Sequence, residues 1–378
     1  MKPLWTKDFT FAFVANFFMA FSFYLLLPTL PAHLIHTMRT SSSMAGVIMS
    51  AYVVAGLCFR PFAGFLIDRL PHRPLYVATF ALFTLFFLLY FGAVSVWIFL
   101  GLRILHGLVW GMIIPAGSTI AIDIVPPERR GEGIGYYGMS MNIAMAFGPL
   151  VGILLQDHLS FSWVLAVAAG GSFLGLFNSL LIRVPSHTPS APKALAFDQF
   201  ILKKGIAGGV AMLFITVSYG LLLTYASIYG KQHDIPGTGV FFVLVSIGFI
   251  VARAAFSPLL DKGWALRLAL AGALAITVAL IALGLFPLAA VYFATGMVFG
   301  LAYGLVFPAL QSWMVGRALP HQRGTANSTF FTAFDLGVGA GMLFGGRMVD
   351  HGNLANAFYV CALSSVVGIL LLRRLPKR

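Results

Sequence analysis

"HGLVWGMIIPAGS", residues 106–118, is matched much later in the chain by "FGLAYGLVFPALQ", residues 299–311. The two stretches carry two glycines and a proline in the same register, at an offset of 193 residues (106 to 299). An internal repeat of this length predicts two halves with the same arrangement of helices. The same offset also relates pairs of charged residues, among them Arg60 and Arg253, Asp68 and Asp261, and Asp157 and Asp350.

The composition indicates that most of the chain lies in a membrane. Of 378 residues, 60% are hydrophobic and only 9% are charged, whereas about a quarter of a soluble protein is charged. Apolar runs near the roughly 20 residues that span a bilayer recur from end to end, without the alternation typical of membrane barrels. We therefore predict an all-α membrane protein with twelve transmembrane helices, at about 9–36, 44–67, 75–93, 96–123, 133–157, 162–182, 205–230, 238–260, 266–286, 288–316, 325–349 and 354–372.

The positions of the basic residues predict the orientation. With the amino terminus inside, 18 Lys and Arg residues fall in cytoplasmic segments, and the outer loops hold only Arg39 and Lys231. This bias predicts that both termini lie in the cytoplasm, in a multi-pass protein of the bacterial inner membrane. The net charge of +13 then reflects topology, and we expect no nucleic-acid partner.

The repeat divides the chain into an N-terminal six-helix bundle (residues 1–182), a cytoplasmic linker (183–204) and a C-terminal six-helix bundle (205–378). Many secondary transporters are built from two such halves, with substrate bound near the membrane midplane. Cys58 and Cys361 both fall inside predicted helices, so they form no CxxC site. We expect no metal and no cofactor, only a proton gradient as the energy source.

Two stretches resemble signatures of the major facilitator superfamily. "GFLIDRLPHR", between the second and third helices, resembles the family's loop signature at Gly64, Asp68, Arg69 and Arg73. Pro71 stands where that signature has glycine, and His72 where it has a basic residue. "RILHG" resembles the fourth-helix signature, with Arg103 and Gly107 matching and His106 in place of glutamine.

A third stretch, "GYYGMSMNIAMAFGPLVG", resembles the fifth-helix signature of the antiporter branch of this superfamily at Gly135, Gly148, Pro149 and Gly152. The resemblance covers the whole chain. It implies two pseudo-symmetric six-helix bundles and a proton-coupled exporter of small molecules, active as a monomer.

The loop signature also suggests a physical role. Asp68 and Asp261, followed by Arg69 and Lys262, lie at predicted cytoplasmic helix ends, where a carboxylate accepts from the free N–H groups of a neighbouring helix. These residues are interpreted as a gate, with solvated charges that set topology as the alternative.

Four glycines, in two pairs spaced four residues apart, form stripes of small residues along the fifth and eleventh predicted helices. Such stripes predict that helix backbones approach each other closely. The glycines are Gly148, Gly152, Gly341 and Gly345. Pro149 predicts a bend of the fifth helix beside this contact.

Five charged residues lie well inside predicted helices: Arg60, Arg103, Arg253, Asp335 and Arg347. Groups at such depth usually face the bundle interior. Arg60 and Arg253 are interpreted as parts of the gate or as substrate contacts. Arg347 lies three residues before Asp350, so we expect an i,i+3 ion pair.

Asp335 is the candidate proton carrier. Its partner in the repeat is Asn142, so both halves have a polar side chain at this position but only the C-terminal half has a titratable one. A carboxyl group in a low-dielectric environment favours its neutral form and ionises when water reaches it, which is what proton coupling requires. The alternative is a static ion pair or a hydrogen bond within its own bundle.

Arg103 and His106 are predicted to assist Asp335 or to contact substrate. A neutral, hydrogen-bonded packing role is the alternative for His106. The predicted substrate cavity comprises Arg103, Asn142, Tyr24, Tyr225, Arg60 and Arg253. With three internal arginines among these residues and a single acid, Asp335, we expect anionic or zwitterionic cargo.

Three alternatives to proton-coupled export are uptake by symport, a membrane-embedded enzyme and a channel. Uptake by proton symport fits the same repeat. A membrane-embedded enzyme would need motifs such as HExxH or GxSxG, which the sequence lacks. A channel is usually built as a symmetric oligomer around a selectivity constriction, whereas a two-fold repeat within one chain suits alternating access.

Overall fold

A computed structural model describes residues 3–184, 202–261, 263–318, 323–351 and 354–376. Within these residues the chain forms twelve α-helices, three short 3-10 turns and no strand, so the predicted all-α fold is confirmed. All the predicted helices are present, with ends within a few residues of the predicted ones. They are α1 (Lys7–His36), α2 (Ser42–Arg69), α3 (His72–Leu89), α4 (Val96–Ile124), α5 (Arg130–His158), α6 (Phe161–Leu181), α7 (Ile206–Gln232), α8 (Val240–Asp261), α9 (Ala265–Leu285), α10 (Ala289–Val315), α11 (Arg323–Asp350) and α12 (Leu354–Arg373).

The helices have the length and surface of membrane spans. Eleven of them, among the described residues, are long and apolar enough to cross a bilayer, and α8 contributes a shorter apolar stretch, Val240–Arg253. Large apolar side chains face outward on several helices; Trp97, Phe173 and Leu363 are all more than 60% exposed. Such surfaces are stable in lipid and costly in water. The chain is therefore a multi-pass membrane protein.

Local sequence explains where several helices begin. Ser95 precedes α4, and its hydroxyl accepts a hydrogen bond from the Ile98 amide at 3.3 Å. Pro71 precedes α3 with φ −58°, a value that suits the start of a helix, where the missing N–H costs nothing. In the first turn of α5, Glu132 accepts two hydrogen bonds from Arg129, and this contact raises the pKa of Arg129 above its ordinary value.

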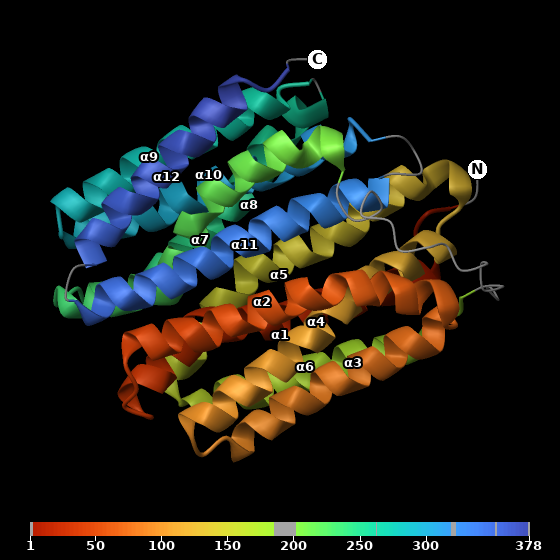
Figure 1. Ribbon diagram of the computed structural model, residues 1–378, viewed down its shortest axis with the longest axis horizontal. Coiled ribbons are helices and arrows are strands. Elements are labelled where there is room, and N and C mark those ends of the chain that lie inside the picture. The colour runs from red at the N-terminus through yellow and green to blue at the C-terminus, as the bar shows by residue number, and fades with distance from the viewer. Residues whose placement is uncertain (1–2, 185–201, 262, 319–322, 352–353, 377–378) are drawn as a thin grey trace. The chain divides into compact units, whose positions relative to one another are not determined.

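The chain divides into two compact units (Figure 1). The first comprises Met1–Leu30 and Ala51–Leu195, and the second comprises Pro31–Ser50 and Ala196–Arg378. Residues 185–201, most of the predicted linker, lie outside the described residues. Pro31–Ser50, the end of α1 and the start of α2, group with the second unit.

In the first unit, α3 packs against α4 and α6, and α5 packs against the same two helices. Glycines allow two further close contacts. A Cβ added at Gly148 on α5 would lie 2.6 Å from Tyr24 Cβ on α1, and one added at Gly107 on α4 would overlap the Tyr52 carbonyl of α2. The backbones of α5 and α1, and of α4 and α2, therefore approach each other directly.

In the second unit, α7 packs against α11 and α12, and α10 packs against α8 and α9. Gly341 on α11 faces the Val217 carbonyl of α7, and Gly300 on α10 faces the Val245 carbonyl of α8; neither position has room for a Cβ. These two glycines are the repeat partners of Gly148 and Gly107. Equivalent positions of the repeat thus make equivalent helix contacts in each unit.

The second glycines of the two stripes, Gly152 and Gly345, differ from each other in what they contact on the neighbouring helix. At Gly152 on α5, an added Cβ would overlap the Leu25 carbonyl of α1, so backbone meets backbone as predicted. Gly345 on α11 departs from this prediction. An added Cβ there would lie 2.5 Å from Leu221 Cδ1 and 2.6 Å from Tyr225 Cδ2, so side chains of α7, and not its backbone, occupy the space beside Gly345. The physical reason is the bulk of the Tyr225 ring, which fills the gap between the two helices at this level.

Candidate functional site

Asp335 lies near the middle of α11 and is half-buried. Its neighbours on the helix are turned toward α7: the Phe334 carbonyl accepts from the Thr216 hydroxyl at 3.3 Å, and the Val338 backbone meets Gly220. The Phe334 ring also packs against Tyr219, with centroids 5.4 Å apart. Asp335 therefore lies on a different face of α11 from the one that contacts α7.

Arg103 is buried in the first unit, with only 2% of its surface exposed. Its guanidinium carbon lies 4.1 Å from the centre of the Tyr52 ring of α2, a cation–π distance. The guanidinium also hydrogen-bonds to the Tyr90 side chain, just beyond the end of α3. Arg103 thus connects α4 to two neighbouring segments through aromatic side chains.

His106, one turn after Arg103, is enclosed by aromatic rings. Phe83, Phe86 and Phe87 of α3 have ring centroids 4.6, 5.1 and 5.0 Å from the imidazole. Its Nδ1 is 2.9 Å from the Tyr90 hydroxyl, while its Nε2 has no hydrogen-bond partner in the part of the chain that the structure describes. These surroundings are the ones expected of a neutral packing residue.

The remaining predicted cavity residues differ in how far helix packing already satisfies their polar groups. Tyr24 is buried beside Phe23 on α1, and the Tyr225 hydroxyl donates to the Met342 carbonyl of α11 at 2.9 Å. By contrast, Asn142 Oδ1 on α5 and Arg253 Nε on α8 are buried without a hydrogen-bond partner among the described residues. These two side chains retain capacity to bind water or a ligand.

The predicted site residues are distributed over both compact units. Arg103, His106, Asn142, Tyr24 and Arg60 belong to the first unit, and Asp335, Tyr225 and Arg253 to the second. Arg60, on α2, is half-buried. Among the described residues, no cluster of three or more His, Cys, Asp or Glu side chains could hold a metal ion.

Two of the predicted gate residues have defined contacts. The Arg69 guanidinium lies 3.8 Å from the centre of the Phe65 ring, one turn earlier on α2. Arg73 donates to the Leu180 carbonyl at the end of α6 at 2.8 Å, where a cation also complements the helix dipole. Gly64 lies within α2. The side chains of Asp68 and Asp261, and Lys262 as a whole, lie outside the described residues.

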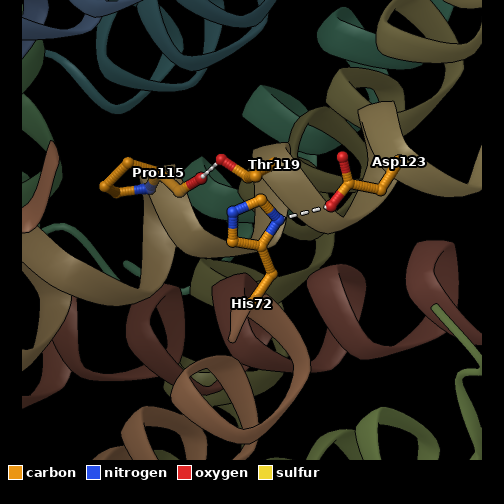
Figure 2. Close-up of polar contacts among 4 residues, drawn as sticks. All are labelled: His72, Pro115, Thr119 and Asp123. Carbon is orange, nitrogen blue, oxygen red and sulfur yellow. Dashed lines mark hydrogen bonds and ion pairs between the residues drawn. The ribbon is translucent and has the colours of Figure 1, made fainter. Parts of the chain in front are cut away.

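One contact near the loop signature was not predicted. His72, the first residue of α3, places Nδ1 2.5 Å from Asp123 Oδ2 in the last turn of α4, as Figure 2 shows. One turn before Asp123, the Thr119 hydroxyl donates to the Pro115 carbonyl at 3.0 Å (Figure 2). The histidine that replaces a basic residue of the signature thus joins α3 to α4. The sequence offers one indication of this pair: in the predicted topology, the start of the third helix and the end of the fourth lie on the same membrane face.

The predicted ion pair between Arg347 and Asp350 is wrong. Asp350 Oδ1 accepts from the Ser42 amide at 2.7 Å, and Oδ2 accepts from the Ser43 amide at 2.8 Å. The first amides of α2 have no partner within their helix and carry the positive end of its dipole, so they satisfy a carboxylate better than one flexible, exposed guanidinium does.

Known proteins resemble this chain along nearly all of its length. A family model described as Major Facilitator Superfamily matches residues 12–341 and residues 294–378. The Staphylopine export protein of Staphylococcus aureus is 22% identical over 347 residues, which cover 88% of this chain and 87% of that protein. Maltose permease of Geobacillus stearothermophilus is 24% identical over 380 residues, which cover 96% of this chain and 93% of that protein.

A solved structure has the same fold. The crystal structure of the human organic anion transporter MFSD10 (TETRAN) has a TM-score of 0.71 to this chain at 19% identity, covering 98% of this chain and all of that one. At this level of identity the likeness concerns the fold alone.

Proposed function

The chain belongs to the major facilitator superfamily and is a membrane transporter. We propose that it exports a small molecule in exchange for protons. The fifth-helix residues Gly148, Pro149 and Gly152 resemble the antiporter branch. A relative named for export aligns over most of the chain. Both observations support movement of substrate out of the cell by alternating access.

The observation that carries the proposal is the half-buried carboxyl group of Asp335 in the middle of α11. Acidic residues inside membrane helices are costly and usually functional. A carboxyl group at this depth is neutral after it binds a proton and must be wetted to release it. Opening to the proton-rich outside would load Asp335, and opening to the cytoplasm would unload it as substrate binds.

The internal charges support an anionic or zwitterionic substrate. Arg60, Arg103 and Arg253 lie within membrane helices, and in the sequence Asp335 is the only carboxylate at comparable depth. A cationic substrate would add to this unbalanced positive charge, whereas a carboxylate would reduce it. We further propose that the protein lies in the bacterial inner membrane as a monomer, with both termini in the cytoplasm.

Proteoliposomes with an imposed pH gradient test the proposal. Staphylopine, maltose, small carboxylates and a panel of drugs serve as labelled probes. For a transported probe, Asp335→Asn should reduce gradient-driven transport at least about tenfold, because the amide cannot exchange a proton. Counterflow without a gradient should persist. Asp157→Asn, at the exposed end of α5, is the control. Unchanged pH dependence in the Asp335 variant would remove this residue from the proposed role.

Uptake by proton symport is the second candidate function. Maltose permease, which aligns over 96% of this chain, favours it. The direction of the pH gradient separates the two functions, because an exporter expels substrate toward the acidic side and a symporter carries it away from that side. A channel would show no counterflow at all.

A further inference from the structure

The start of α2 and the end of α11 are joined by a carboxylate. Both segments belong to the second compact unit. The two oxygens of Asp350 accept from consecutive backbone amides, Ser42 N at 2.7 Å and Ser43 N at 2.8 Å. Hydrogen bonds to an ionised acceptor are about twice as strong as neutral ones. Because two of the donors are backbone groups, the interaction depends on the position of the first turn of α2, and the Ser42 and Ser43 side chains add to it.

A second layer of contacts lies beside this carboxylate. The Tyr225 hydroxyl of α7 donates to the Met342 carbonyl at 2.9 Å and lies 3.5 Å from the Ser42 carbonyl. Gly46 on α2 has no room for a Cβ, which would lie 2.7 Å from the Met342 carbonyl oxygen. Gly346 on α11 meets the Ser42 carbonyl in the same way. The two backbones therefore meet at glycines, and the Tyr225 hydroxyl lies beside both of them.

This combination suits a contact that opens and closes. Smooth glycine surfaces separate without rearranging side chains, and water can replace the amide donors once the carboxylate moves away. The equivalent residue of the repeat, Asp157 at the end of α5, is exposed and makes no hydrogen bond or ion pair within the described part of the chain. Within that part, the repeat thus contains this contact once.

We propose that Asp350 and the first amides of α2 form a clamp that holds the outer ends of α2 and α11 together and releases once in each transport cycle. The proposal rests on the alternating access described above. It adds a gating residue that differs from the proton carrier, because Asp335 lies about four turns away along α11 (15 residues). Breaking the clamp should therefore increase the time that the two helix ends spend apart.

Distances between spin labels test this in lipid nanodiscs. Labels on cysteines at Val47 and Arg347, both exposed, report the separation of α2 from α11 in a chain without Cys58. The parent should show a short and a long population. Asp350→Ala should raise the ratio of long to short about tenfold, and Asp350→Asn, which keeps one acceptor oxygen, should have a smaller effect. Asp157→Ala is the matched control and should change nothing.

Thiol labelling supplies a second measurement. Cysteine at Ser42, a position only 5% exposed, keeps both amide donors and should react with a water-soluble maleimide about tenfold faster in Asp350→Ala. Tyr225→Phe, which removes only the hydroxyl, should give a smaller increase and serves if Asp350→Ala does not fold.

A single distance population unaffected by Asp350→Ala, or equal effects of Asp350→Ala and Asp157→Ala, would overturn the clamp. Neither measurement uses a proton gradient or a substrate, so the outcome is independent of the Asp335 experiment.

Discussion

At the scale of single residues, the polar side chains inside the helices differ in what surrounds them. Arg103 and His106 lie among the tyrosine and phenylalanine rings of their own unit. Asn142 and Arg253 have buried side-chain atoms without a hydrogen-bond partner among the described residues. A buried polar atom without a partner is unfavourable. His106 Nε2 is also such an atom, but aromatic rings enclose the imidazole, so Asn142 and Arg253 are the better candidates for contacts with water and substrate.

His106→Phe separates the two roles considered for this histidine. The aromatic cage around His106 accommodates a phenyl ring, and the main loss is one hydrogen bond to Tyr90, worth about 1 kcal/mol. We expect pH-driven transport within about threefold of the parent and a modest fall in the thermal unfolding midpoint. His106→Asn, which leaves a void, should be less stable. Loss of proton-driven transport in both variants would assign His106 to proton transfer.

At the scale of helices, the sequence predicts where each helix lies but not how side chains on different helices pair. The apolar runs and their boundaries locate all twelve helices, because both depend on local sequence. The His72–Asp123 and Asp350–Ser42 contacts depend on how each helix is rotated about its axis, which no local pattern determines. Asp350 therefore looked like the partner of Arg347, its neighbour in the sequence.

Substitution of glycines by alanine tests the close helix contacts. Gly148→Ala on α5 would push against Tyr24, and Gly341→Ala on α11 against the Val217 carbonyl, so each should destabilise the protein by about 1–3 kcal/mol. Gly138→Ala, also on α5, meets nothing within 4 Å and should be neutral or slightly stabilising. Thermal unfolding in detergent measures all three. Equal midpoints for Gly148→Ala and Gly138→Ala would contradict close packing of α5 against α1.

At the scale of the whole molecule, the basic residues fall into two sets, one that predicts the orientation in the membrane and one that lies inside the helices. Most of the basic residues lie at helix ends, in loops or near the termini, and they predict the orientation, because positively charged loops stay in the cytoplasm. A few arginines lie well within the helices, and for these we propose contacts with substrate. The repeat pairs Arg60 with Arg253 but gives Arg103 a glycine, Gly296, as its counterpart, and it does not identify the substrate. Recognition depends on side chains from many helices, whose combined arrangement no single motif encodes.

Reporter fusions test the predicted orientation directly. Green fluorescent protein fused after Arg378 should fluoresce, because it folds in the cytoplasm. Alkaline phosphatase, which is active only outside the cytoplasm, should be active when fused after Asp234, in the turn between α7 and α8, and inactive when fused after Trp264, just before α9. Only Arg39 and Lys231 lie in the expected outer loops, and the more basic loops are expected on the cytoplasmic side. Phosphatase activity at Trp264 without activity at Asp234 would invert the topology, and with it the side to which Asp350 and its clamp are assigned.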